Sequence, residues 1–134
     1  MSETMTINEK MLRALKSAVR YVDDCMSGLN RKDNSAIADS LWHVGAEIEY
    51  ALFLLSITIG DESGMARLNS NFDFKKTNID SIMVDLRNLL AEAEGFVLDK
   101  KLLEAYERVY VARYLVLKVR QDLAKKKREM LKKK

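Results

Sequence analysis

The apolar residues of this chain recur three or four positions apart over most of its length, the spacing that places them on one side of an α-helix. The first such run covers residues 7–29, and Gly28 and Asn30 indicate where it ends. A second run begins after Asp33 or Asn34, because either side chain can accept hydrogen bonds from the first backbone N–H groups of a helix. The first half of the chain is therefore predicted to form two amphipathic helices joined by a short polar turn.

The second helix is predicted to end at Gly60 and to be the central helix of the fold. Beside its main apolar stripe, Phe53, Leu54 and Ile57 extend the apolar surface around its C-terminal half, and a helix that is apolar all round is buried on several sides. The main stripe consists of Ile37, Leu41, Val44, Ile48, Ala51, Leu52, Leu55 and Ile59.

Residues 60–77 are the only long stretch without helical spacing, and such a length is typical of a crossover between distant ends of a bundle. Asn78 is predicted to cap a third helix, and Gly95 and Asp99 mark a break before the fourth, with Asp99 as its cap. Four apolar residues are expected to anchor the crossover: Met65, Leu68, Phe72 and Phe74.

Four helical segments and the absence of proline predict an all-α fold, a four-helix bundle with a long C-terminal helix and one long crossover connection. A chain of 134 residues suffices for one hydrophobic core. We divide it into a helical bundle domain, residues 1–124, and a basic C-terminal extension of the last helix, residues 125–134, which we call the basic arm.

The last helix, from about residue 100 to beyond residue 126, carries two apolar lines, more than one side of a small bundle needs. One line joins Leu103, Tyr106, Tyr110, Tyr114 and Leu117. The other has the alternating steps of a coiled-coil seam, so we expect a homo-oligomer, with a dimer favoured. Its candidate interface residues are Leu102, Ala105, Val109, Ala112, Val116, Val119 and Leu123.

Charge is distributed unevenly along the chain. Residues 118–134 hold nine basic and two acidic side chains, a net charge of +7, whereas the preceding 117 residues hold 14 basic and 18 acidic ones, a net charge of −4. A basic run of this kind attracts polyanions such as RNA or DNA. The alternative is a solvated helix end, where lysines only oppose the helix dipole and keep the protein in solution. The candidate nucleic-acid-binding residues are Lys125, Lys126, Lys127, Arg128, Lys132, Lys133 and Lys134.

Few residues offer catalytic chemistry. His43 and Glu47 share a helix face, but a metal site in a bundle needs Glu-x-x-His motifs from several helices and this chain has one His, so a His–Glu hydrogen bond is predicted instead. Cys25 follows two aspartates, which raise the pKa of a thiol, and is interpreted as a packing residue. No catalytic, metal-binding or cofactor-binding residue is predicted, and the protein is expected not to be an enzyme.

Tyr106, Tyr110 and Tyr114 alternate with Arg108 and Arg113. Aromatic rings beside guanidinium groups can stack bases and hold phosphates. At a spacing of four residues, however, an aromatic line is more often part of a core or an interface. We favour core or interface and keep a nucleic-acid platform as the alternative.

The stretch SLWHVGAEIEYALFLLS, residues 40–56, together with the basic helical C-terminus, resembles short uncharacterised all-helical proteins of archaea. The resemblance implies a helical fold and brings no activity with it. The small helical RNases that partner nucleotidyltransferases use an Arg-x(4–6)-His pair, but here the nearest arginine before His43 is Arg31, which is too distant.

These patterns favour a non-catalytic helical module that self-associates and binds RNA or DNA through the basic arm. The alternative is a protein–protein interaction bundle that uses the spare apolar face of the last helix, with the lysines only solubilising. The longest apolar run, Ile48 to Ile59, is too short to span a bilayer, and the N-terminus lacks a secretion signal, so a soluble cytoplasmic protein is predicted.

Overall fold

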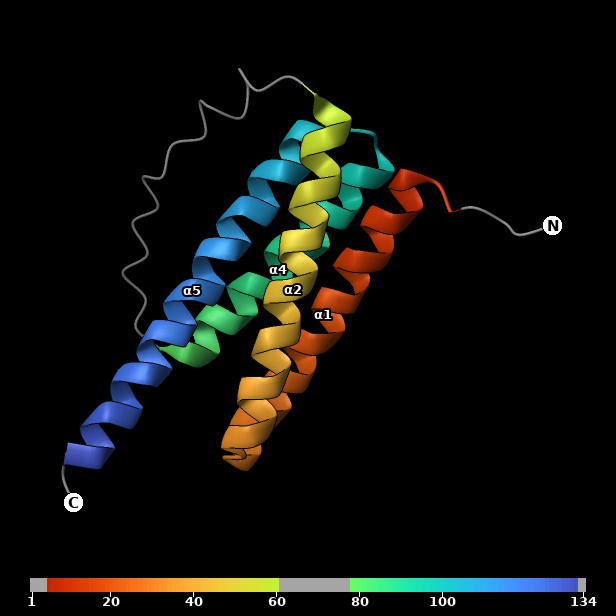
Figure 1. Cartoon of the computed structure of the whole chain (residues 1–134). Coiled ribbons are helices and arrows are strands. Elements are labelled where there is room, and N and C mark those ends of the chain that lie inside the picture. The colour runs from red at the N-terminus through yellow and green to blue at the C-terminus, as the bar shows by residue number, and fades with distance from the viewer. Residues whose placement is uncertain (1–4, 61–77, 133–134) are drawn as a thin grey trace.

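A computed structural model describes residues 5–60 and 78–132 of the chain. This part contains no strand and four helices: α1 (Ile7–Arg31), α2 (Asn34–Ile59), α4 (Ile79–Leu98) and α5 (Leu102–Lys132) (Figure 1). The prediction of an all-α four-helix bundle is confirmed. The C-terminal helix α5 is the longest of the four, with 31 residues.

Each helix packs against two neighbours, α1 and α5 both lying between α2 and α4. In Figure 1, α1 and α5 run in one direction along the bundle and α2 and α4 run in the other, so every neighbouring pair is antiparallel. Because α2 ends at the opposite end of the bundle from the start of α4, the chain crosses over between them, as predicted. The four expected anchors of this crossover, Met65, Leu68, Phe72 and Phe74, lie outside the described residues.

The hydrophobic core lies between the four helices and is built from the apolar stripes that the sequence shows. All four helices contribute, and burying each large side chain stabilises the fold by about 1.5–3 kcal/mol. The largest fully buried side chains are Met11, Leu15, Ile48, Leu55, Ile82, Met83, Leu86, Leu90 and Leu115.

The prediction that α2 is central is wrong. Its main stripe is buried except for Ile59, which is partly buried, and Leu54 is buried as well, but Phe53 is 58% exposed and Ile57 is 54% exposed. The reason is that α2 occupies a corner of the bundle and packs mainly on α1 and α5, and two neighbours cannot cover its C-terminal half, which is apolar all round.

Local capping signals set several helix ends as predicted. The Asp33 side chain accepts a hydrogen bond from the Ala36 N–H at 3.1 Å, and the Asn78 side chain accepts one from the Asp80 N–H at 2.9 Å. Gly60 ends α2 with a φ of +70°, a conformation that glycine adopts without strain.

Three other expected helix ends are corrected by the structure. Helix α1 continues through Gly28 to Arg31. Gly28 serves packing instead, since a Cβ there would lie 3.2 Å from Cγ1 of Ile37 on α2. Helix α4 likewise continues through Gly95, and Asp99 caps its C-terminus rather than the start of α5. Gly28 and Asp99 therefore have roles that differ from the expected ones.

Candidate functional site

The basic arm begins where α5 leaves the bundle. Val119 is the last buried residue of the helix, and every side chain from Ala124 to Lys132 is exposed. These nine residues extend the helix by about 13 Å at 1.5 Å per residue. In Figure 1 the last turns of α5 stand clear of the other helices.

The structure brings five of the predicted nucleic-acid-binding residues together on this exposed helix. They are Lys125, Lys126, Lys127, Arg128 and Lys132. Within the described part of the chain, no carboxylate forms an ion pair with any of them; the nearest pair along α5 joins Lys118 Nζ to Asp122 at 4.0 Å. Lys133 and Lys134 lie outside the described residues.

The α5 residues that were predicted to form the oligomer interface lie in the core of the bundle instead. Ala105, Val109, Ala112 and Val119 are fully buried and Val116 is 3% exposed, so this line packs inside the core of its own chain. Leu102 and Leu123 are partly buried against the same core. This corrects the assignment, since residues that already fill the core have no surface to offer to a second chain.

The second apolar line of α5 is the one left at the surface, beside an exposed side of α2. We call this surface the α2–α5 face. Trp42 is 61% exposed, Phe53 is 58% exposed and Leu117 is 39% exposed. The face is formed by Trp42, Gly45, Ala46, Glu49 and Phe53 of α2 and by Tyr106, Tyr110, Arg113, Leu117 and Arg120 of α5.

Three hollows follow one another along the α2–α5 face. The middle one, about 240 Å³, shares Trp42 and Arg120 with a hollow of about 370 Å³ near Leu123. It shares Glu49 and Arg113 with a third hollow of about 330 Å³ beside Phe53. Together they form a shallow groove between the two helices.

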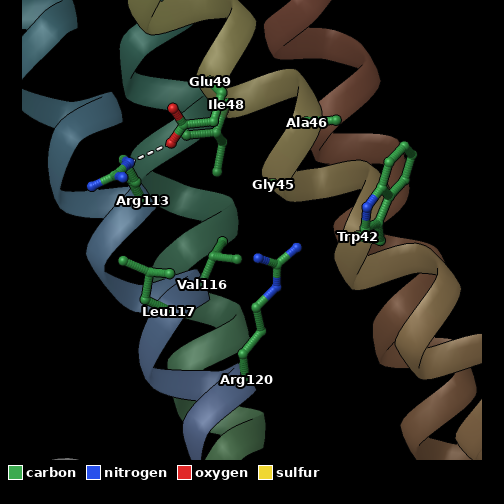
Figure 2. Close-up of a pocket in the computed structure, with 9 residues that line it drawn as sticks. All are labelled: Trp42, Gly45, Ala46, Ile48, Glu49, Arg113, Val116, Leu117 and Arg120. Carbon is green, nitrogen blue, oxygen red and sulfur yellow. Dashed lines mark hydrogen bonds and ion pairs between the residues drawn. The ribbon is translucent and has the colours of Figure 1, made fainter.

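Two arginines of α5 occupy this groove in different ways (Figure 2). Arg113 donates a hydrogen bond from Nε to the Glu49 carboxylate and forms an ion pair with it. Arg120 lies over Gly45, with Nη2 3.0 Å from the place where a Cβ would stand, and no carboxylate among the described residues pairs with it. Sequence reasoning missed this arrangement; the one signal was Glu49, the single charged residue in the run from Ile48 to Ile59.

The tyrosines of α5 do not share one surface with both Arg108 and Arg113, as a nucleic-acid-binding platform would require. Tyr106 and Tyr110 are partly buried and stack with their ring centroids 6.3 Å apart, and burial raises the pKa of the Tyr106 phenol. Arg108 turns toward α4, where it donates to Glu92 at 3.1 Å, whereas Arg113 turns toward α2. The two guanidinium groups are therefore on opposite sides of the helix, and each is engaged by a carboxylate.

His43 has a different partner from the predicted one. Its Nε2 lies 3.8 Å from the Asp39 carboxylate, one turn before it on α2, and not against Glu47. The Tyr21 ring of α1 stacks on the imidazole at 4.6 Å between centroids. This stacking fixes the direction of the ring, so the expected His–Glu hydrogen bond is replaced by a contact with Asp39.

Cys25 is fully buried in the core, and burial raises the pKa of its thiol to about 11. The cause is the apolar surroundings rather than the neighbouring aspartates. In the described part of the chain, no group of three or more His, Cys, Asp and Glu side chains is placed to hold a metal ion.

None of the described helices is long and apolar enough to cross a membrane. Comparison of the chain with protein-family models, with curated proteins and with solved structures finds no match in any of the three.

Proposed function

We propose that this protein is a non-catalytic helical module that self-associates and binds polyanions, RNA or DNA, through the basic arm at the end of α5. The observation that carries the proposal is the position of this arm. Val119 is the last buried residue of α5 and the helix is exposed from Ala124 to Lys132, so the basic side chains of the arm are exposed, and they have no carboxylate partner among the described residues.

The helical form of the arm arranges part of its charge in a stripe. Lys125, Arg128 and Lys132 are three and four residues apart, so they share one side of the helix. Glu129 is the single acidic residue in the arm. A stripe of this kind can neutralise several phosphates along a nucleic-acid backbone, and each contact releases a condensed counterion.

The binding expected from such a stripe is independent of base sequence and sensitive to salt. Phosphate contacts position a protein but do not read bases. With about four phosphates contacted, the logarithm of the association constant should fall against the logarithm of the salt concentration with a slope of about −3.5 on duplex DNA.

The test is a titration of labelled oligonucleotides at several salt concentrations. The triple variant Lys125→Gln, Arg128→Gln, Lys132→Gln should reduce the steepness of the slope by about 2.7. The matched control removes the same charge elsewhere, through glutamine at three exposed lysines of α1 and of the turn before α5: Lys10, Lys16 and Lys101. Equal weakening by both triples would show that only net charge matters, and no binding by the wild type at low salt would refute the proposal.

A second candidate function is supported by the α2–α5 face. Large apolar side chains exposed together in this way are typical of protein–protein contacts. In this alternative the protein is an interaction bundle for another protein, and the lysines only keep it in solution. It becomes the better interpretation if the wild type binds no oligonucleotide and is a monomer.

A further inference from the structure

Among the described residues, no helix of the bundle covers the apolar surface of the α2–α5 face. From their exposed fractions, Trp42, Phe53 and Leu117 contribute about 300 Å², taking about 200 Å² for a large side chain. The partly buried rings of Tyr106 and Tyr110 border it. A standard interface takes about 800 Å² from each partner, so these three side chains would supply roughly a third of it as an apolar centre, and the polar side chains around them would have to supply the rest.

We propose that a second copy of this chain covers the α2–α5 face, in a dimer whose two-fold axis runs parallel to the helices. The inference rests on the self-association in the proposed function and names the surface and the orientation that produce it. In this dimer, the interface consists of exposed residues of α2 and α5 and not of the buried α5 residues that were predicted from the sequence.

Residues of α2 and α5 lie side by side at matching levels along the α2–α5 face. Glu49 pairs with Arg113 at the middle of the face. Seven residues earlier on α2 stands Trp42, and seven residues later on α5 stands Arg120, and these two line the same hollow. Toward the other end, Phe53 of α2 lines a hollow with Tyr106 and Tyr110 of α5. The face thus has three levels along the helices. Trp42 and Arg120 lie at one end, the ion pair of Glu49 and Arg113 lies in the middle, and Phe53 lies beside the two tyrosines at the other end.

Charge then decides between the two ways of placing this face against itself. A two-fold axis across the helices would put Glu49 opposite Glu49 of the other copy and Arg113 opposite its own equivalent, and like charges at an interface are unfavourable. A two-fold axis along the helices puts α2 of one copy over α5 of the other at the same level. Each Glu49 then meets Arg113 of the other copy, and the four groups alternate in sign.

The remaining levels are complementary in the same arrangement. Trp42 of one copy is placed over Arg120 of the other, where a guanidinium without a carboxylate partner among the described residues can pack on an indole ring. Phe53 is placed over the tyrosine rings, an aromatic contact that buries apolar surface on both sides. Each favourable contact occurs twice, as an isologous interface requires.

This orientation has a consequence for the basic arm. Because the axis runs along the helices, both arms leave the dimer at the same end. One polyanion can then contact both arms, so the second arm binds at a high effective concentration. By reciprocity, a polyanion that bridges the arms strengthens the dimer.

The first experiment measures the mass of the full chain by sedimentation equilibrium, for the wild type and for single variants. Phe53→Asp and Leu117→Asp should each raise the dissociation constant of the dimer at least about 30-fold. The control is Val84→Asp, which places the same charge on a 45% exposed valine of α4, away from the face; its effect should stay below about threefold. A wild type that stays monomeric at high concentration, or equal effects of all three variants, would overturn the proposal.

A mixing experiment separates loss of association from loss of folding. Glu49→Arg alone and Arg113→Glu alone should each be folded monomers, because both side chains are about half exposed and their pair within one chain adds little to the fold. Mixed in equal amounts, the two variants restore opposite charges across the interface and should form a heterodimer. If the mixture stays monomeric while the wild type dimerises, the dimer uses another surface.

The orientation is tested by a distance between spin labels at Ala124→Cys, an exposed position on the same side of α5 as Arg113. Cys25 is buried with its thiol protonated, so it does not compete for the label. The parallel axis places the two labels about 15–25 Å apart, whereas the crossed arrangement separates residues 11 positions from the centre by about 35 Å. The longer distance would refute the proposed axis.

The outcomes also distinguish this inference from the proposed binding function. A monomer that binds oligonucleotides with the salt slope expected for one arm leaves the arm function in place and refutes the dimer. A dimer with the short label distance that binds no oligonucleotide supports the interface and refutes the arm function.

Discussion

Substituting alanine at two helical glycines should have opposite effects on stability, although the chemical change is the same. Alanine is the better helix former by about 1 kcal/mol, because glycine loses more backbone freedom on folding. At Gly95, no atom lies within 4 Å of the place where the new Cβ would stand. Gly95→Ala should therefore raise the free energy of unfolding by about 0.5–1 kcal/mol.

At Gly28 the new methyl group would meet α2. Its Cβ would lie 3.2 Å from Cγ1 of Ile37 and 3.3 Å from the backbone N of the same residue, and a backbone atom cannot rotate away as a side-chain end can. Overpacking of this kind typically costs about 1–3 kcal/mol, which exceeds the gain in helix propensity. We expect Gly28→Ala to lower the free energy of unfolding by about 0–2 kcal/mol.

Gly45→Ala provides an internal control for this reasoning. Its Cβ would lie 3.0 Å from Nη2 of Arg120, which is the end of an exposed and adaptable side chain. The arginine can move aside, so the variant should gain stability as Gly95→Ala does. Urea denaturation followed by circular dichroism measures all three differences, provided that the slopes against denaturant agree. If Gly28→Ala stabilises the protein as much as Gly95→Ala, the close approach of α1 and α2 at Gly28 is wrong.

Three further predictions concern titratable and polar groups. Burial raises the pKa of the Glu94 carboxyl, so the protonated side chain adds to the free energy of unfolding at low pH and this contribution is lost as pH rises through the raised pKa. Glu94→Gln should therefore raise the melting temperature near pH 7 and change it little near pH 4. The Cys25 thiol, with a pKa of about 11, should react with an alkylating reagent only as fast as the bundle opens, so a fast reaction in native buffer would contradict its burial. His43→Ala removes the stacking on Tyr21 and should cost about 1 kcal/mol of stability while oligonucleotide binding stays unchanged, which a melt and a titration of the same sample check.

Much of the local structure follows from the sequence, because its signals act over a few residues. Asp33 and Asn78 accept hydrogen bonds from backbone N–H groups two or three positions later, and Gly60 adopts a left-handed conformation at the end of α2. The apolar period likewise determined which stripe of α1, α2 and α4 enters the core. The exposed basic arm could be predicted for the same reason, since no apolar stripe continues into it.

Only the tertiary structure decided which of several equivalent local choices is used. Both apolar lines of α5 have helical spacing, and the packing of α2 and α4 selected the line with Val109 for the core and left the line with Leu117 at the surface. The partner of His43 follows the same rule. Asp39 and Glu47 are each four residues away, and the Tyr21 ring from α1 fixes the imidazole where Asp39 is the nearer carboxylate. The spacing of residues along one helix cannot distinguish the two apolar lines of α5, or the two carboxylates near His43. Contacts with a neighbouring helix favour one of each pair, and these contacts exist only in the folded protein.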